Sequence, residues 1–194
     1  MDADLNNLRQ AAECHRIRAA AEEELDEILE VMDAAFASLN RLSKADFVEI
    51  RSLRNPPRLV ILAAEAMCIM FDLKFQPHDV FKVAHRCLLT NPGYTLSKMQ
   101  HYDRDNIPEA TVARIEAFLR RHSEDFTPQN AAKVSKWAAA CCEWVRAMVE
   151  YHHKALVVAP MRQALQTAHD RHSASMTVLT HLAEQVLSVG LELS

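Results

Sequence analysis

Residues 25–42, LDEILEVMDAAFASLNRL, carry an apolar or small side chain at alternating intervals of three and four residues. This spacing is the heptad pattern of a helix that pairs with another helix in a coiled coil. The repeating positions are Leu25, Ile28, Met32, Ala35, Leu39 and Leu42. No glycine or proline precedes Pro56, so we expect one helix to run from the N-terminal region to about Asn55.

A second heptad occupies the C-terminal third of the chain. Its seam is Val158, Met161, Leu165, Ala168, His172, Ser175, Leu179, Leu182, Val186, Val189 and Leu193. The small and polar members in the middle make this seam weak. Between residues 151 and 160 the phase is ambiguous, because Leu156, Val157 and Val158 all fit. Pro160 lies inside the pattern, where it should kink the helix or remove a hydrogen bond.

The middle of the chain, residues 56–150, is divided by helix-start signals. Asn55-Pro56-Pro57 predicts a helix over residues 57–71, and a second break follows at 76–79. Residues 91–93, Asn-Pro-Gly, predict a turn, and residues 105–108 open another helix. A capping threonine at 127, followed by a proline, opens a helix that we expect to continue into the C-terminal third.

These patterns predict an all-α fold, with a small multi-helix globular head at the tip of a two-stranded antiparallel coiled coil. The predicted parts are an outgoing stalk helix over residues 1–55, the head over 56–150, and a returning stalk helix over 151–194. The chain leaves along one long helix and returns along another, so an antiparallel pair is the simplest arrangement. A parallel dimer and an ordinary four-helix bundle remain alternatives.

Composition narrows the class of protein. Only two glycines occur in 194 residues, which is unfavourable for sheets and for nucleotide-binding loops. Residues 1–40 carry ten acidic side chains against three basic ones, and the net charge of −4 argues against a nucleic-acid partner. No apolar run predicts a membrane span or a secretory signal. The odd number of cysteines, without a C-x-x-C pair, is typical of a reduced, cytoplasmic protein.

No set of residues predicts catalysis, a cofactor or a metal. His169 and His172 share a helix face but lack further ligands at suitable spacing. P-loop, dinucleotide, nucleophile-elbow and HExxH motifs are absent from the sequence. We interpret the tryptophans at 137 and 144 as packing anchors. Apolar neighbours indicate inert core thiols at Cys68, Cys87 and Cys141.

Basic residues of the head come from separate segments. Lys133 and Lys136 are three residues apart and are expected on one face of the helix that starts at residue 127, while the others are Arg58, Lys98 and Arg114. If these side chains converge on one outward surface, they would favour an acidic partner.

Several motifs then make the sequence resemble a known family. Residues 47–57, FVEIRSLRNPP, resemble the end of the outgoing stalk helix of dynein heavy chains, and residues 102–108, YDRDNIP, resemble the mid-head motif of the axonemal members. DFTP at 125–128, KVSK at 133–136 and EWVRAM at 143–148 are similar to their last head helix, and VVAP at 157–160 matches the returning strand. The resemblance covers about residues 40–165, in order and with fitting spacing.

The resemblance implies a microtubule-binding domain at the end of a dynein stalk, in cilia or flagella. It implies that tubulin is contacted by Arg58, Lys98, Lys133 and Lys136, with Arg114 a weaker candidate. Many relatives have lysine where this chain has Ile61, which puts that contact in doubt.

It further implies that the two stalk helices signal by sliding about half a heptad, with Pro56, Pro57 and Pro160 as coupling points. The implied partners are the microtubule and the rest of the heavy chain, whose AAA+ ring would hydrolyse ATP. A helical scaffold or dimerisation module without track binding is the alternative function.

Overall fold

The computed structural model describes the backbone of residues 2–192. It describes the side chains of residues 26–160 together with some outward-facing ones beyond them. Within residues 2–192 there are eight α-helices, one π-helix and one 3₁₀-helix, and no strand. The all-helical prediction is confirmed. The elements are α1 (Asp2–Asn40), α2 (Lys44–Ser52), α3 (Arg58–Met70), α4 (Val80–Ala84), η1 (His85–Leu89), α5 (Pro92–Gln100), η2 (Arg104–Asn106), α6 (Glu109–Arg121), α7 (Pro128–Ala132) and α8 (Lys136–Glu192).

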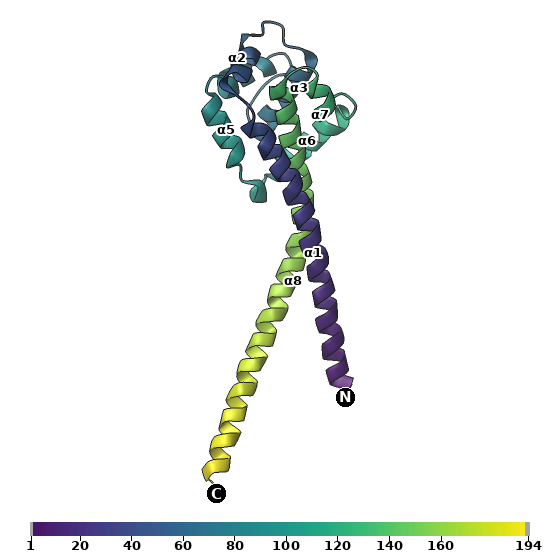
Figure 1. Ribbon diagram of the computed structural model, residues 1–194, viewed down its shortest axis with the longest axis vertical. Coiled ribbons are helices and arrows are strands. Elements are labelled where there is room, and N and C mark those ends of the chain that lie inside the picture. Colours follow the sequence, from purple (N-terminus) through teal and green to yellow (C-terminus); the bar gives the residue numbers. More distant parts are fainter. Residues whose placement is uncertain (1, 193–194) are drawn as a thin grey trace. The chain divides into compact units, whose positions relative to one another are not determined.

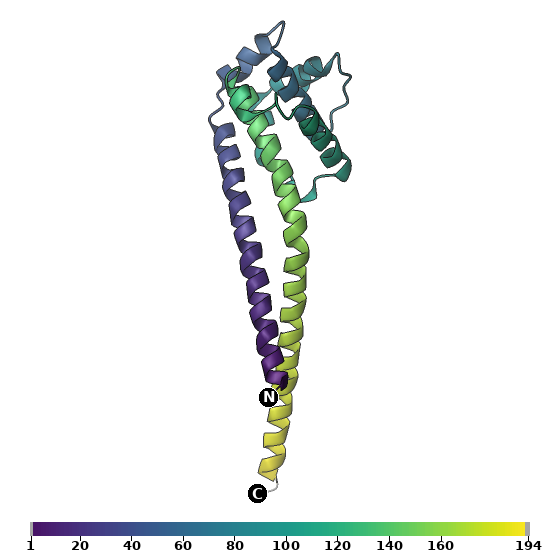
Figure 2. The same ribbon diagram turned by 90° about the vertical axis from the view of Figure 1, so that its right-hand side faces the viewer.

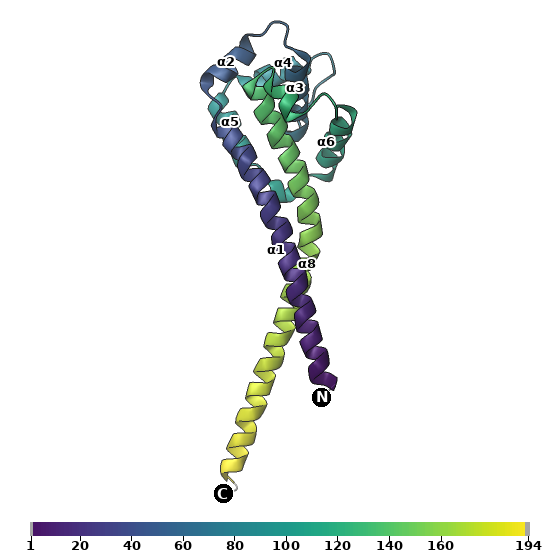
Figure 3. The ribbon, with the colours of Figure 1, turned by 45° about the vertical axis from the view of Figure 1, so that its right-hand side comes forward.

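The chain forms two compact units, residues 26–155 and the remaining parts of the two long helices. In the first unit, the last turns of α1 and the first turns of α8 run side by side in opposite directions (Figures 2 and 3). The predicted α1 seam is buried from Ile28 to Leu42, at 9% exposure or less. The side chain of Leu25 lies outside the described set, as does the second seam from Met161 onward.

The ambiguous phase of the second heptad is settled by burial. Val158 is 3% exposed, whereas Leu156 is 62% and Val157 is 53% exposed. The seam of α8 therefore passes through Val158 in this structure. α8 also continues through Pro160 as one helix.

The prediction of one unbroken helix to about Asn55 is wrong. α1 ends at Asn40, and α2 begins after Ser43 with a capping box. The Ser43 hydroxyl accepts a hydrogen bond from the Asp46 amide at 3.3 Å, and the Asp46 carboxylate accepts one from the Ser43 amide at 2.7 Å. These bonds satisfy donors that a new helix start leaves unpaired, so the chain can change direction without glycine or proline.

α3 forms the centre of the head, where it packs against α4, α6 and α7 (Figures 1 and 3). Nine of its thirteen residues are buried, because its sequence is apolar on nearly every side. Trp137 and Trp144 of α8 are at most 1% exposed, which confirms them as packing anchors. The Trp144 ring stacks on Phe71, with centroids 5.9 Å apart, and meets Tyr102 edge-on at 5.3 Å.

Two further local predictions need correction. Asn91-Pro92-Gly93 begins α5 rather than forming a free turn, because the Asn91 side chain caps the Tyr94 amide at 3.1 Å. Cys87 is exposed on η1, whereas Cys68 and Cys141 are buried as expected. Pro56-Pro57 does open α3, and the Thr127 hydroxyl does cap α7 by accepting from the Asn130 amide at 3.2 Å.

Candidate functional site

Arg58 is placed by the start of α3. Pro57 is the cap residue, and its carbonyl accepts hydrogen bonds from the amides of Val60 and Ile61 at 2.9 and 3.2 Å. Pro57 fixes the backbone at the start of α3, and Arg58 is the first residue of the helix. Its guanidinium lies 2.7 Å from the carboxylate of Asp125, yet the arginine side chain remains 70% exposed. Arg58 is therefore oriented and still open to solvent.

Lys133 and Lys136 do not share one helix, contrary to the sequence prediction. α7 has only five residues and ends at Ala132, with Lys133 as its cap residue, and α8 starts at Lys136. Ser135 separates them because its hydroxyl accepts from the Ala138 amide at 3.4 Å and so opens a new helix. Lys133 donates a hydrogen bond to the Asn130 side chain at 3.2 Å.

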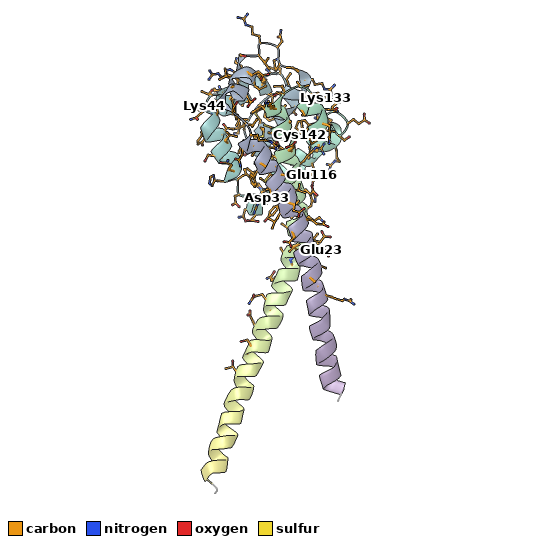
Figure 4. All side chains as sticks on the ribbon, in the orientation of Figure 1. Glu23, Asp33, Lys44, Glu116, Lys133 and Cys142 are labelled. Carbon is orange, nitrogen blue, oxygen red and sulfur yellow. The ribbon has the colours of Figure 1, made fainter. Side chains whose placement is uncertain are left out.

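The structure brings Arg58 and Lys133 together. They line one hollow between the start of α3 and the turn after α7, with Leu59, Asp125, Asn130 and Val134. Figure 4 shows Lys133 at the outer part of the head and Cys142 in its interior. We call Arg58, Lys133 and the nearby α8 residue Lys136 the first basic group.

Lys136 is exposed at the start of α8. Hydrogen bonds from Ser43 lower the pKa of Asp46, and the positive charge of Lys136 lowers it further. The start of α8 is therefore close enough to the start of α2 for their charges to interact.

Lys98 and Arg114 lie at the opposite end of α3. The Lys98 ammonium is 4.9 Å from the ring centroid of Phe71 and 5.9 Å from that of Tyr94. Arg114 pairs with Asp72 at 3.0 Å. Phe71 and Asp72 directly follow α3, whose thirteen residues span about 20 Å. Lys98 and Arg114 thus form a second basic group.

Outward positions of α3 connect the two groups. Ile61 and Glu65 are partly exposed and follow Arg58 at helical spacing on the same face. Ile61, whose contact the sequence resemblance put in doubt, is therefore a partly exposed apolar side chain on this face.

The mid-head motif fastens the loop after α5 to other elements. The Tyr102 hydroxyl donates to the Met70 carbonyl at 2.9 Å, and the Arg104 guanidinium lies 4.7 Å from the ring centroid of Tyr151. Tyr151 also donates a hydrogen bond to Asp105. Sequence reasoning missed Tyr151, although its spacing of seven from Trp144 was visible. It also missed Asp125 and Asp72, whose tertiary partners no local pattern reveals.

Among the described residues, no three His, Cys, Asp or Glu side chains are grouped as a metal site would require. The side chains of His169 and His172 lie outside that set. Burial raises the pKa of Cys68 to about 12 and that of Cys142 to about 11. In the described part of the chain, no helix combines the length and the apolar character needed to cross a bilayer.

Comparison with known proteins gives a consistent set of relatives. Residues 8–194 match the family described as the microtubule-binding stalk of dynein motor. Mouse dynein axonemal heavy chain 1 is 38% identical over 152 residues, which cover 74% of this chain and 4% of the relative. Human dynein axonemal heavy chain 3 is 34% identical over 180 residues, covering 87% of this chain and 4% of the relative. The chain thus spans a small fraction of the length of these relatives.

A solved structure has a similar fold. The microtubule-binding domain of dynein-c superposes with a TM-score of 0.62 at 27% identity. The match covers 74% of this chain and 96% of that one. The similarity therefore includes nearly all of the solved domain.

Proposed function

The chain belongs to the family of microtubule-binding stalks of dynein motors, and on this premise we propose that its two basic groups bind the acidic surface of a microtubule. The observation that carries the proposal is the position of Arg58 and Lys133 on one exposed hollow, although they are 75 residues apart in the sequence. Lys136 adds a third positive charge at the start of α8. Lys98 contributes from the other end of α3, with Arg114 as a weaker contact.

The existing partners of these side chains favour this role. Asn130 and the rings of Phe71 and Tyr94 orient Lys133 and Lys98 without removing their charge. Side chains that are oriented before binding lose less conformational entropy when a partner arrives. Exposed positive charge also accelerates encounter with an acidic filament, and salt weakens this effect.

We propose further that affinity is coupled to the register of the stalk helices. Val158 is buried while its two preceding apolar neighbours are exposed. A change of register that slides α8 by about half a heptad and also turns it about its axis would bury Leu156 or Val157 in place of Val158 at modest cost, because all three side chains are apolar. Pro57 starts α3 directly after the loop that follows α2, and Pro160 lies in α8, so Pro56, Pro57 and Pro160 are proposed coupling points.

The larger protein is proposed to be an axonemal dynein, because the matched relatives carry axonemal and flagellar names. The stalk domain is not the ATPase part of a dynein. Nucleotide hydrolysis and attachment to the rest of the heavy chain are therefore proposed for the whole motor.

Co-sedimentation with microtubules over a series of salt concentrations tests the proposal. Lys133→Glu and Lys136→Glu should each weaken binding, most at low salt, whereas Lys82→Glu on α4 is the matched control outside both groups. Normal pelleting of both test variants would refute the basic surface and favour a scaffold role. For the register proposal, cysteine pairs that lock the stalk in each register should give different affinities, and equal affinities would refute it.

A further inference from the structure

The hollow between α3 and α7 has an apolar part that electrostatic binding does not use. Its volume is about 290 Å³, and Leu59 and Val134 line it together with the polar rim. Clefts that bury drug-sized ligands occupy about 300–1,000 Å³, so this open hollow is at the lower limit for such a ligand. A space of this size suits one bulky side chain.

Val134 is an apolar side chain that remains exposed next to a buried segment. It is 38% exposed, whereas Ala131, three residues earlier on α7, is fully buried. Leu59 is only partly buried, although the next residue of α3, Val60, is 0% exposed. Two neighbouring apolar side chains therefore meet water on the same hollow, and covering them would be favourable.

The rim around these two side chains is ordered. Asp125 holds Arg58, and the Asn130 amide donates to the carbonyls of Glu124 and Asp125 at 3.1 and 3.4 Å. Asn130 in turn accepts from Lys133. Arg58 has five donors and uses one side of its guanidinium on Asp125, so it can bind a further carboxylate. The rim thus combines a fixed shape with unused capacity for an acidic partner.

We propose that the hollow receives one apolar side chain from an acidic segment of the tubulin surface, with Leu59 and Val134 covering it and Arg58 and Lys133 contacting the flanking carboxylates. This inference rests on the proposed function and specifies what the first basic group binds. The charges on the rim select an acidic segment, and the apolar contact adds affinity that salt does not screen.

The charged contacts and the apolar contact should depend differently on salt, so the experiment separates them by varying the salt concentration. The dissociation constant for microtubules is measured at several salt concentrations for Val134→Ser, Val134→Ala and Lys133→Glu. Val134→Ser should weaken binding by about three- to tenfold, because part of an apolar side chain loses its burial. The weakening should be the same factor at every salt concentration, with Val134→Ala intermediate. Lys133→Glu should weaken binding mainly at low salt.

Val48→Ser is the matched control, because Val48 is 52% exposed on α2 and does not line the hollow. Thermal unfolding checks that each variant is folded. If Val134→Ser is not folded, Val134→Ala replaces it in the binding measurement. Unchanged binding of the Val134 variants, with weakened binding of Lys133→Glu, would overturn this inference and leave the proposed function intact. If Lys133→Glu and Lys136→Glu also bound normally, the proposed function itself would fail. A Val134 effect that disappears at high salt would overturn the apolar contact.

Discussion

The hydroxyl of Tyr151 donates a hydrogen bond to the carboxylate of Asp105, a residue 46 positions earlier in the chain. Arg104 lies over the ring of the same tyrosine. One aromatic side chain of α8 thus holds η2, the short 3₁₀-helix between α5 and α6. This contact gives the mid-head motif, residues 102–108, a structural role, whereas the sequence resemblance identified the motif without indicating what it contacts.

Tyr151→Phe should destabilise the protein by about 1–2 kcal/mol, because it removes a hydrogen bond to a charged acceptor but leaves the ring in place. Burial, together with the bond to Asp105, raises the pKa of Tyr151, so the hydroxyl remains protonated at neutral pH. Chemical denaturation measures the loss. Tyr94→Phe is the control, since Tyr94 is 58% exposed. Equal stability of Tyr151→Phe and wild type would show that the bond contributes little.

Asp125→Asn should strengthen microtubule binding by about two- to fivefold. The substitution frees Arg58 from an exposed ion pair of about 0.2–1 kcal/mol and removes a negative charge from the rim of the hollow. The gain should shrink as salt increases. Glu116→Gln is the control, because Glu116 pairs with Arg120 and His153 instead. Unchanged binding would mean that Arg58 is not a filament contact, whereas weaker binding would mean that its orientation by Asp125 contributes more than its release.

The capping box at Ser43 and Asp46 marks a helix boundary that the sequence analysis did not predict, although most of the other helices were predicted. Both the long α1 seam and the head's proline-led helices were predictable, since they depend on local spacing and on backbone restrictions. The break at residues 41–43 was not, although S-x-x-D is a recognisable start signal, because the heptad continued through Leu42. Likewise, Ser135 divides α7 from α8 with one hydroxyl. A single polar cap can outweigh helix propensity over a few residues.

Tertiary pairs were beyond sequence reasoning. Nothing in the spacing of Arg58 and Asp125, or of Arg114 and Asp72, indicates that these charges meet. The division of the basic residues between the two ends of α3 depends on how the surrounding helices pack, and packing is a property of the whole core. Sequence therefore identified the basic candidates but not their grouping.

Ser43→Ala should destabilise the protein by about 1 kcal/mol at neutral pH, the usual cost of losing an N-cap. The folded-state pKa of Asp46 is lowered from 3.8, so its stabilising contribution is present above pH 3.8 and is lost as pH falls through the lower folded value. The difference between variant and wild type should therefore narrow in acid. Denaturation at neutral and acidic pH measures this, with Ser52→Ala as the control. If the stability difference between Ser43→Ala and wild type did not change with pH, the Asp46 carboxylate would be excluded as the source of that difference.

Asp72→Gly should be more stable than Asp72→Ala by about 1 kcal/mol. Asp72 follows the cap residue of α3 and has φ 49°, a left-handed conformation that glycine adopts without strain and alanine does not. Both variants lose the ion pair with Arg114, so their difference isolates the backbone. Comparing their unfolding midpoints tests this, and Arg114→Ala reports the ion pair alone. Equal stability of the two variants would show that the left-handed residue is not fixed in solution.

Thiol reactivity should separate Cys87 from the other three described cysteines. The thiolate is the reacting form, and burial raises the pKa of Cys68 and Cys142 to about 12 and about 11 and that of Cys141 well above its usual range. Cys87 is exposed on η1.

In a Cys14→Ser background, which removes the cysteine whose side chain is outside the described set, one thiol should react rapidly with an aromatic disulfide reagent. The buried three should react only as fast as the head opens. Adding Cys87→Ser should abolish the rapid phase, and a rapid phase that survives in the double variant would mean that the core around α3 and α8 is more open than its burial indicates.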